Sequence, residues 1–259
     1  MFRDCKAVVL DIEGVLFAGK EALPGGREVV ETLAARGIPH RYLTNNSRMT
    51  AAELEAHMRS LGLPVEAGRI VSVLDRAGDY LRRGSPGGKV FVIGGEALRS
   101  AVGAAGFEVA GPGEEDADIV LVGIDPDLTY LALSAAARAV ARGARFVALN
   151  PDVRAPLEGG AFQLGGGAVA APVAAAGGRA PECIGKPSPF LFEEALGQLG
   201  AAPGEAVMVG DNPRTDVEGA RALGIAAVWV NQGVYGPPEE PPDLEVGRVD
   251  EILPHLPGG

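Results

Sequence analysis

Short apolar runs alternate with segments of helical periodicity along most of this 259-residue chain, and this alternation limits what the chain can fold into. The apolar runs are short and largely uninterrupted, which is typical of strands buried on both faces of a sheet. They are KAVVLD (6–11), HRYLT (40–44), KVFVIGG (89–95), DIVLVGI (118–124), RFVALN (145–150), EAVMVGD (205–211) and AAVWVN (226–231). The segments between them have apolar residues at helical spacing and mostly end at glycine, a common helix stop: 25–37, 50–62, 72–84, a segment ending near 106, 128–143, 188–200 and 215–224. Strands and helices in this order predict an α/β fold with a parallel sheet.

Two stretches of the chain echo each other and indicate two units. Residues 35–48 (ARGIPHRYLTNNSR) resemble residues 141–154 (ARGARFVALNPDVR), and both run from a helix end through a strand into a loop that contains asparagine. We therefore predict that the middle of the chain is an α/β unit of its own, at about 79–178. This unit is expected to be inserted between the two parts of a sheet domain, 1–78 and 179–259.

Composition excludes several classes of protein. The formal net charge of −11 argues against a general nucleic-acid binder, because an acidic protein is repelled by the phosphate backbone. Cys5 and Cys183 have no metal-site or disulfide spacing. The apolar stretch 165–178 is interrupted by glycines and a proline and is too short to span a bilayer. Because there is no signal-peptide pattern, we expect a cytoplasmic protein that binds neither nucleic acid nor membrane.

Four loops that follow strands or coil carry polar groups that belong together. They are Asp11-Ile12-Glu13-Gly14, Thr44-Asn45-Asn46, Gly185-Lys186-Pro187-Ser188-Pro189, and Gly210-Asp211-Asn212 with Thr215-Asp216 after it. Each loop alone also suits a turn or a helix cap, since aspartate, asparagine and glycine favour both. In an open parallel sheet, however, ligands bind beyond the carboxyl ends of the strands, where such loops gather. Four of them in one chain favour a common site.

The chemistry that needs these groups together is phosphoryl transfer. A carboxylate such as Asp11 can attack phosphorus and form an aspartyl phosphate, but the phosphate dianion repels it unless a cation lies between them. Mg²⁺ suits this role because it takes hard oxygen ligands and needs only a few, which Asp11 and Asp211 can supply. Lys186, one of only four lysines, can act as a point charge on the phosphate. The Thr44 hydroxyl can donate to the phosphate oxygens.

The four loops, in this order, resemble the four motifs of the haloacid dehalogenase (HAD) superfamily. LDIEGVL, TNN, GKPSP and GDNPRTD are similar to subfamily IIA in particular, the NagD and p-nitrophenyl phosphatase group. ALNPD (148–152) is typical of that group's cap domain, so the resemblance covers nearly the whole chain. It implies a Rossmann-like core with a parallel sheet, an inserted α/β cap of the C2 type, and Mg²⁺-dependent hydrolysis of a small phosphorylated metabolite.

The resemblance also implies roles for individual residues. Asp11 is expected to be the nucleophile and a metal ligand, and Glu13 to give its backbone carbonyl to the metal and its side chain as general acid/base. Asp211 is expected to bind the metal, with Asn212 and Asp216 supporting the site from behind. Four residues are expected to hold the phosphate: Thr44, Asn45, Asn46 and Lys186.

Glu13 departs from the pattern of these phosphatases, which normally have aspartate at this position. The two carboxyl groups have ordinary pKa values within about half a unit of each other, so acidity is not the difficulty. Reach is, because glutamate adds one C–C bond of about 1.5 Å, and a misplacement of about 1 Å can cost around a hundredfold in rate. The metal ligand here is a main-chain oxygen, so Mg²⁺ binding is expected to survive.

Three functions remain open from the sequence. The first is a working phosphatase, and the second is a binding or regulatory protein that turns over very little because of Glu13. The third is another HAD transfer reaction such as that of a phosphomutase, against which stands the large cap. A P-loop nucleotide-binding protein is disfavoured, because no glycine-lysine pair is followed by serine or threonine.

The substrate is not legible in the cap sequence. Asn150 and Asp152 are candidates for lining the substrate cleft, because their loop echoes the TNN loop, although a structural Asx turn explains them as well. A homodimer through the cap is an expectation by analogy alone.

Overall fold

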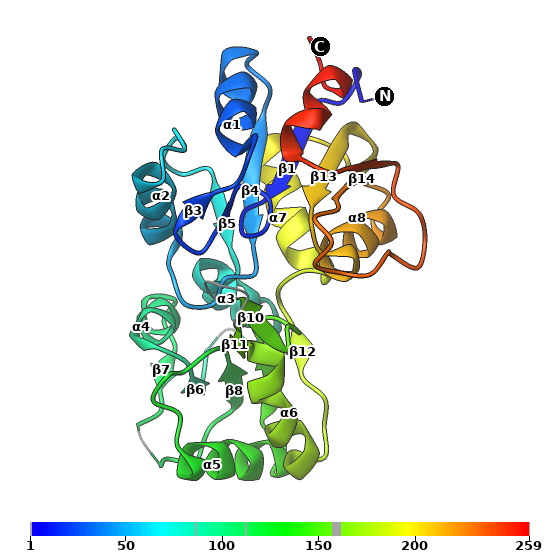
Figure 1. Ribbon diagram of the computed structural model, residues 1–259. Coiled ribbons are helices and arrows are strands. Elements are labelled where there is room, and N and C mark those ends of the chain that lie inside the picture. Colours follow the sequence, from blue (N-terminus) through cyan, green and yellow to red (C-terminus); the bar gives the residue numbers. More distant parts are fainter. Residues whose placement is uncertain (1, 86, 112, 157–161, 259) are drawn as a thin grey trace. The chain divides into compact units, whose positions relative to one another are not determined.

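The computed structural model describes residues 2–85, 87–111, 113–156 and 162–258, and within them the chain forms two compact units (Figure 1). The first unit contains residues 1–44, 51–71 and 186–259, and the second contains residues 45–50 and 72–185. The second unit therefore includes the predicted 79–178 segment and extends beyond it on both sides. Helix α3 (Val73–Gly84) spans the predicted boundary at 78 and belongs wholly to the second unit.

A six-stranded sheet forms the first unit. Its strand order is β15-β14-β13-β1-β4-β5, and its strands are β1 (Ala7–Asp11), β4 (His40–Thr44), β5 (Ile70–Ser72), β13 (Ala206–Gly210), β14 (Ala226–Val230) and β15 (Leu244–Val246). The pairs β1–β4, β1–β13, β13–β14 and β14–β15 are all parallel. All five residues of β1 and of β13 are buried, as expected of strands covered on both faces. Asp11 is the last residue of β1, an interior strand, and therefore lies at the carboxyl edge of this sheet.

Helices and a small hairpin complete the first unit. They are α1 (Gly26–Ala35), α2 (Ala51–Ser60), α7 (Pro189–Leu199) and α8 (Gly219–Ala222), with the π-helical turn η3 (Pro213–Glu218) and the short helices η2 (Pro203–Glu205) and η4 (Val249–His255). The hairpin consists of β2 (Phe17–Ala18) and β3 (Glu21–Ala22), paired antiparallel directly after the Asp11 loop. No helix in the described ranges combines the length and apolarity that crossing a membrane requires.

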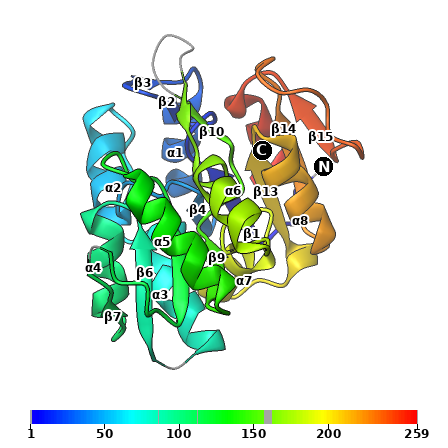
Figure 2. The same cartoon turned by 90° about the horizontal axis from the view of Figure 1, so that it is seen from below.

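The second unit has its own parallel sheet, ordered β12-β9-β8-β6-β7. Its strands are β6 (Lys89–Ile93), β7 (Glu108–Val109), β8 (Ile119–Val122), β9 (Arg145–Ala148) and β12 (Glu182–Cys183). Helices α3 and α4 (Glu96–Ala104) pack together, as do α5 (Tyr130–Ala141) and α6 (Gly166–Gly177), which lie side by side in Figure 2. Phe91, Val120 and Phe146 point from the sheet into a core of small side chains on α5 and α6. A separate hairpin pairs β10 (Arg154–Pro156) with β11 (Phe162–Leu164).

The α/β fold with parallel sheets is thus confirmed, and most of the predicted strands and helices are present within a few residues of their expected ends. Helix α6 was not predicted from the sequence, because glycines and Pro172 break its pattern. Its glycines permit close packing: a Cβ on Gly167 would lie 2.2 Å from the carbonyl oxygen of Pro151, and one on Gly177 would lie 2.7 Å from Val140.

Candidate active site

The loop after β1 brings Asp11 and Gly14 against the loop after β13. Asp11 is buried and lies opposite Leu43 of β4 in the parallel register. Gly14 has φ +87°, and a Cβ at this position would lie 2.3 Å from the carboxylate of Asp211. A side chain is therefore excluded here both by the backbone conformation and by the close approach of Asp211. The glycine allows the first and fourth predicted loops to meet.

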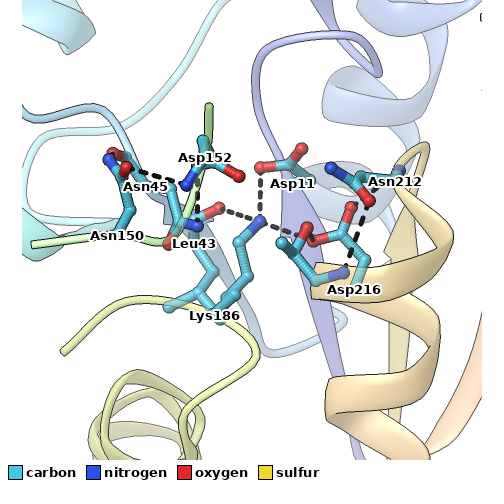
Figure 3. A network of polar contacts seen from close by, with 9 residues as sticks. Asp11, Leu43, Asn45, Asn150, Asp152, Lys186, Asn212 and Asp216 are labelled. Carbon is cyan, nitrogen blue, oxygen red and sulfur yellow. Dashed lines mark hydrogen bonds and ion pairs between the residues drawn. The ribbon is translucent and has the colours of Figure 1, made fainter. Parts of the chain in front are cut away.

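Lys186 lies between two carboxylates of the first unit (Figure 3). Its ammonium nitrogen Nζ is 2.7 Å from Oδ1 of Asp11, 2.7 Å from Oδ1 of Asp216, and 3.3 Å from the backbone oxygen of Leu43. The side chain is 2% exposed, so Lys186 is not a solvated surface lysine. Burial alone lowers the pKa of Lys186, but the charges of Asp11 and Asp216 outweigh it and raise this pKa above its usual value.

Three aspartates of the first unit, Asp11, Asp211 and Asp216, each offer a carboxylate oxygen within 4.8 Å of the others. Burial raises the pKa of Asp11 to about 7; the charge of Lys186 opposes this shift, and that of Asp216 adds to it. Burial, followed by the charges of Asp11 and Asp216, raises the pKa of Asp211 well above its usual range. One lysine therefore does not compensate the negative charge that this cluster carries when ionised.

The donor set of this cluster fits a divalent cation. Carboxylate oxygens are the hard ligands that Mg²⁺ takes, and the raised pKa values mark a place where added positive charge stabilises the ionised carboxylates. Asp216 is already engaged: Oδ1 accepts from Lys186, and Oδ2 accepts from the backbone N–H of Asn212 at 3.0 Å. Asp11 and Asp211 are thus better available as direct ligands, with Asp216 orienting Lys186 and the loop after β13.

Asn212 and Trp229 hold the loop after β13 in place. The Asn212 side chain begins η3 by accepting from the backbone N–H groups of Arg214 and Thr215 at 3.1 and 3.4 Å. The indole N–H of Trp229 donates to the backbone oxygen of Asp211 at 2.8 Å. Residue 212 therefore acts as a helix cap, which is one of the two roles that the sequence left open for this loop.

The TNN loop divides between the two units. Thr44 ends β4 and is buried in the first unit, next to the Leu43 carbonyl that Lys186 contacts. Asn45 and Asn46 belong to the second unit. The Asn46 side chain accepts from the backbone N–H groups of Arg48 and Met49 at 2.9 and 3.0 Å, which makes it the Asx turn considered from the sequence.

Within the second unit, the two echoing loops contact each other (Figure 3). Asn150 Nδ2 donates to the backbone oxygen of Asn45 at 2.8 Å, and Asn45 Nδ2 donates to Oδ2 of Asp152 at 3.2 Å. The Asn150 oxygen accepts from the backbone N–H of Asp152 at 3.2 Å. This is the Asx turn that was the alternative to a substrate contact, and it also holds Asn45.

Gln232 contacts the candidate site and was missed from the sequence. Its side-chain amide donates to the backbone oxygen of Gly14 at 2.8 Å. The residue lies two positions after the end of β14, at the same carboxyl edge of the sheet as Asp11 and Asp211. Extending the strand-end rule to the AAVWVN run would have identified it.

Comparison with known proteins agrees with this architecture. The model of the haloacid dehalogenase-like hydrolases matches residues 8–108, and that of the HAD-hydrolase-like family matches residues 183–257. An acid sugar phosphatase of Staphylococcus aureus is 34% identical over 232 residues, which cover 90% of this chain and 88% of that protein. NagD from E. coli K-12 superposes with a TM-score of 0.87 at 32% identity, covering 96% of this chain and 98% of that one.

A 4-nitrophenylphosphatase from Thermotoga maritima superposes with a TM-score of 0.88 at 26% identity, covering 98% of both chains. These relatives span nearly the whole chain, including the inserted second unit, so the likeness is not confined to the sheet of the first. The chain accordingly belongs to the haloacid dehalogenase-like hydrolases, in the NagD and p-nitrophenyl phosphatase group of subfamily IIA, and is a phosphoric monoester hydrolase.

Proposed function

We propose that this protein is a Mg²⁺-dependent phosphatase that hydrolyses a small phosphomonoester through an aspartyl phosphate on Asp11. The observation that carries the proposal is the buried cluster of Asp11, Asp211 and Asp216 around Lys186. A cluster of this kind is costly to bury without a task, because the carboxylates repel one another in a poorly solvated place. Its position at the carboxyl edge of a parallel sheet is where ligands bind in such folds.

Mg²⁺ would be held by carboxylate oxygens of Asp11 and Asp211 and by the backbone carbonyl of Glu13. When bound, the cation screens the Asp11 carboxylate from the phosphate dianion and withdraws charge from the phosphate oxygens. Lys186, whose ammonium group is already paired with Asp11, would provide a fixed positive charge that stabilises the same phosphate oxygens. Asp216 keeps Lys186 protonated and in place through its own ion pair. Four residues are proposed to hold the phosphate: Thr44, Asn45, Asn46 and Lys186.

The reaction divides into two displacements at phosphorus. In the first, an Asp11 oxygen bonds to phosphorus, the bond to the leaving oxygen breaks, and the Glu13 carboxylic acid gives its proton to that oxygen. In the second, water attacks the phosphorus of the aspartyl phosphate, the bond between phosphorus and the Asp11 oxygen breaks, and the Glu13 carboxylate takes a proton from that water. Inorganic phosphate then leaves, and both side chains return to their starting states.

Glu13 is the specific observation that favours a second candidate function. If its longer side chain misses the leaving oxygen, the protein holds Mg²⁺ and phosphate ligands but turns over slowly, as a binding or regulatory protein would. Glu13 is half-buried, and its backbone is bridged to Phe17 at the start of the hairpin. We favour the intermediate case, a slow but real phosphatase.

The substrate class is proposed from the relatives. The name of the Staphylococcus aureus protein makes sugar phosphates the first candidates here. The cytoplasmic location and a homodimer through the second unit stay predictions from the sequence and the resemblance.

Turnover of a panel of phosphomonoesters tests the proposal. The panel combines p-nitrophenyl phosphate with sugar, glycerol and nucleoside phosphates and pyridoxal phosphate, each assayed with Mg²⁺ and after EDTA treatment. We expect activity with Mg²⁺, its loss with EDTA, and in Asp211→Ala a steeply raised Mg²⁺ requirement, because a direct oxygen ligand is removed. Full activity of EDTA-treated protein would show that the site is misassigned.

A further inference from the structure

The β2–β3 hairpin is joined to the Glu13 loop by backbone contacts. The Gly14 N–H donates to the Phe17 oxygen at 2.9 Å, and Glu13 and Phe17 form an isolated bridge. Phe17 is 3% exposed, whereas both residues of β3, the strand paired with it, are exposed. The backbone of Glu13 is therefore set by where Phe17 lies, and Phe17 begins the hairpin.

His57 of α2 contacts this hairpin at two points. Its Nε2 lies 2.9 Å from the backbone oxygen of Gly19 in the hairpin turn, so Nε2 carries the proton and donates. Its ring meets the Phe17 ring edge to face, with centroids 5.0 Å apart and an interplanar angle of 78°. Both contacts lie within the first unit.

The helix that carries His57 is itself firmly seated. Leu54 and Met58 of α2 are fully buried, and the buried Glu55 carboxylate accepts from the Gly68 N–H at 2.6 Å. A histidine on such a helix can hold an exposed turn in place, because its own position costs little further ordering. The contact thus runs from a fixed helix to an exposed turn.

We propose that His57 is a positioning residue that latches the β2–β3 hairpin and thereby fixes the backbone from which Glu13 reaches the reacting oxygen. The inference rests on the proposed role of Glu13 as general acid/base. Glutamate has one more rotatable bond than aspartate at this position, so its placement depends more on a fixed backbone. A contact outside the Glu13 loop fixes the backbone of Glu13 without placing another side chain in the active site.

Hydrogen exchange and kinetics of four proteins test the latch: wild type, His57→Phe, His57→Gln and the control His255→Phe. His57→Phe keeps a ring against Phe17 but has no donor, whereas His57→Gln keeps an N–H that can reach Gly19. His255 lies in η4, which packs on α1 and β15. We expect faster amide exchange over residues 14–22 in His57→Phe only. With phenyl phosphate, whose leaving oxygen needs a proton, we expect the kcat of His57→Phe to fall about tenfold and its KM to stay nearly unchanged.

Combination with Glu13→Ala isolates the route of the effect. Because the latch acts through Glu13, His57→Phe should lower kcat no further once Glu13 is alanine, while it should still speed exchange in the hairpin. Unchanged exchange in His57→Phe would overturn the latch. Two outcomes would overturn the coupling to Glu13 even if exchange in the hairpin is faster. One is a kcat of His57→Phe that equals that of wild type. The other is that adding His57→Phe to Glu13→Ala lowers kcat by the same factor as adding it to wild type. Activity that survives in Asp11→Asn would instead count against the proposed function.

Discussion

The loops after β1 and β13 in the first unit and the loop after β9 in the second unit occupy the same place in their sheets, but their polar groups have different partners. All follow buried strands of a parallel sheet and carry asparagine or aspartate. In the first unit, Lys186 pairs with Asp11 and Asp216, and the pKa values of Asp11 and Asp211 are raised. In the second unit, Asn150 and Asp152 bond to each other and to Asn45.

This difference shows what strand-end position does and does not establish. The edge of a parallel sheet gathers polar loops in both units, so position alone nominates candidates. What separates the two is the kind of partner: Asn150 and Asp152 hydrogen-bond to the chain itself, whereas the buried carboxylates of the first unit have one lysine near them. A loop whose hydrogen bonds close on one another is built for structure, whereas buried carboxylates with too little positive charge are built to receive a ligand.

The largest expected effect is that of Asp11→Asn. A carboxamide is a poor nucleophile and a weaker metal ligand, so turnover of p-nitrophenyl phosphate should fall by at least about a thousandfold. The fold should persist, because asparagine has nearly the same volume, and circular dichroism checks this. Substantial activity in the folded variant would remove Asp11 from the nucleophile role.

Lys186→Ala should come next. Its charge acts on phosphate oxygens present both in the bound substrate and in the transition state, so KM should rise and kcat should fall by about 10²–10³. Lys186→Arg should rescue only partly, because a planar guanidinium does not replace a compact ammonium between Asp11 and Asp216. Wild-type kinetics in Lys186→Ala would show that Lys186 does not act on the phosphate. The cluster in the first unit would then have only a structural role, like the loop after β9.

Glu13→Asp should have a smaller effect and the opposite sign. Restoring the usual reach should raise turnover of a substrate with a poor leaving group about tenfold, which is less than the 10²–10⁴ that a fully positioned acid or base contributes. Glu13→Ala should fall below wild type. If wild type equals Glu13→Ala and Glu13→Asp gains greatly, the natural protein is a binder; if Glu13→Asp is slower than wild type, the loop is built around the longer side chain.

Asn150→Ala should have the smallest effect on catalysis. It removes the hydrogen bond to the Asn45 carbonyl, so we expect about 1–2 kcal/mol less stability on thermal unfolding and a kcat within about threefold of wild type. A loss of kcat comparable to that of Lys186→Ala, without loss of stability, would show that the second unit's loop takes part in the chemistry and would erase the contrast between the two loops.

The sequence predicted the fold well where local pattern and final structure agree. Strand β1 and helix α5 follow from apolar runs and helical spacing that need no tertiary information. Helix α6 could not be predicted this way, because its glycines serve close contacts with Pro151 and Val140 that only the folded chain creates. The β2–β3 hairpin has two-residue strands, too short to leave a periodic signal.

The site was less predictable than the fold. Asp11, Lys186 and Asp211 could be nominated from ordered motifs, but the ion pair between Lys186 and Asp216 depends on burial that sequence does not report. The sequence also left Asn46 open between phosphate ligand and Asx turn, and its two backbone contacts decide what its oxygen does. His57 carries no motif at all, since its partner is a backbone oxygen.

A rapid-quench experiment on Glu13→Ala with p-nitrophenyl phosphate and Mg²⁺ tests most directly whether the buried cluster performs phosphoryl transfer through Asp11. The p-nitrophenolate leaving group needs no proton, so the first displacement should proceed, while the second should stall because nothing activates the water. We predict a burst of p-nitrophenolate close to one per protein and, by mass spectrometry, a phosphoryl group on the peptide that contains Asp11. Steady turnover with no burst and no phosphoryl group on that peptide would contradict the account.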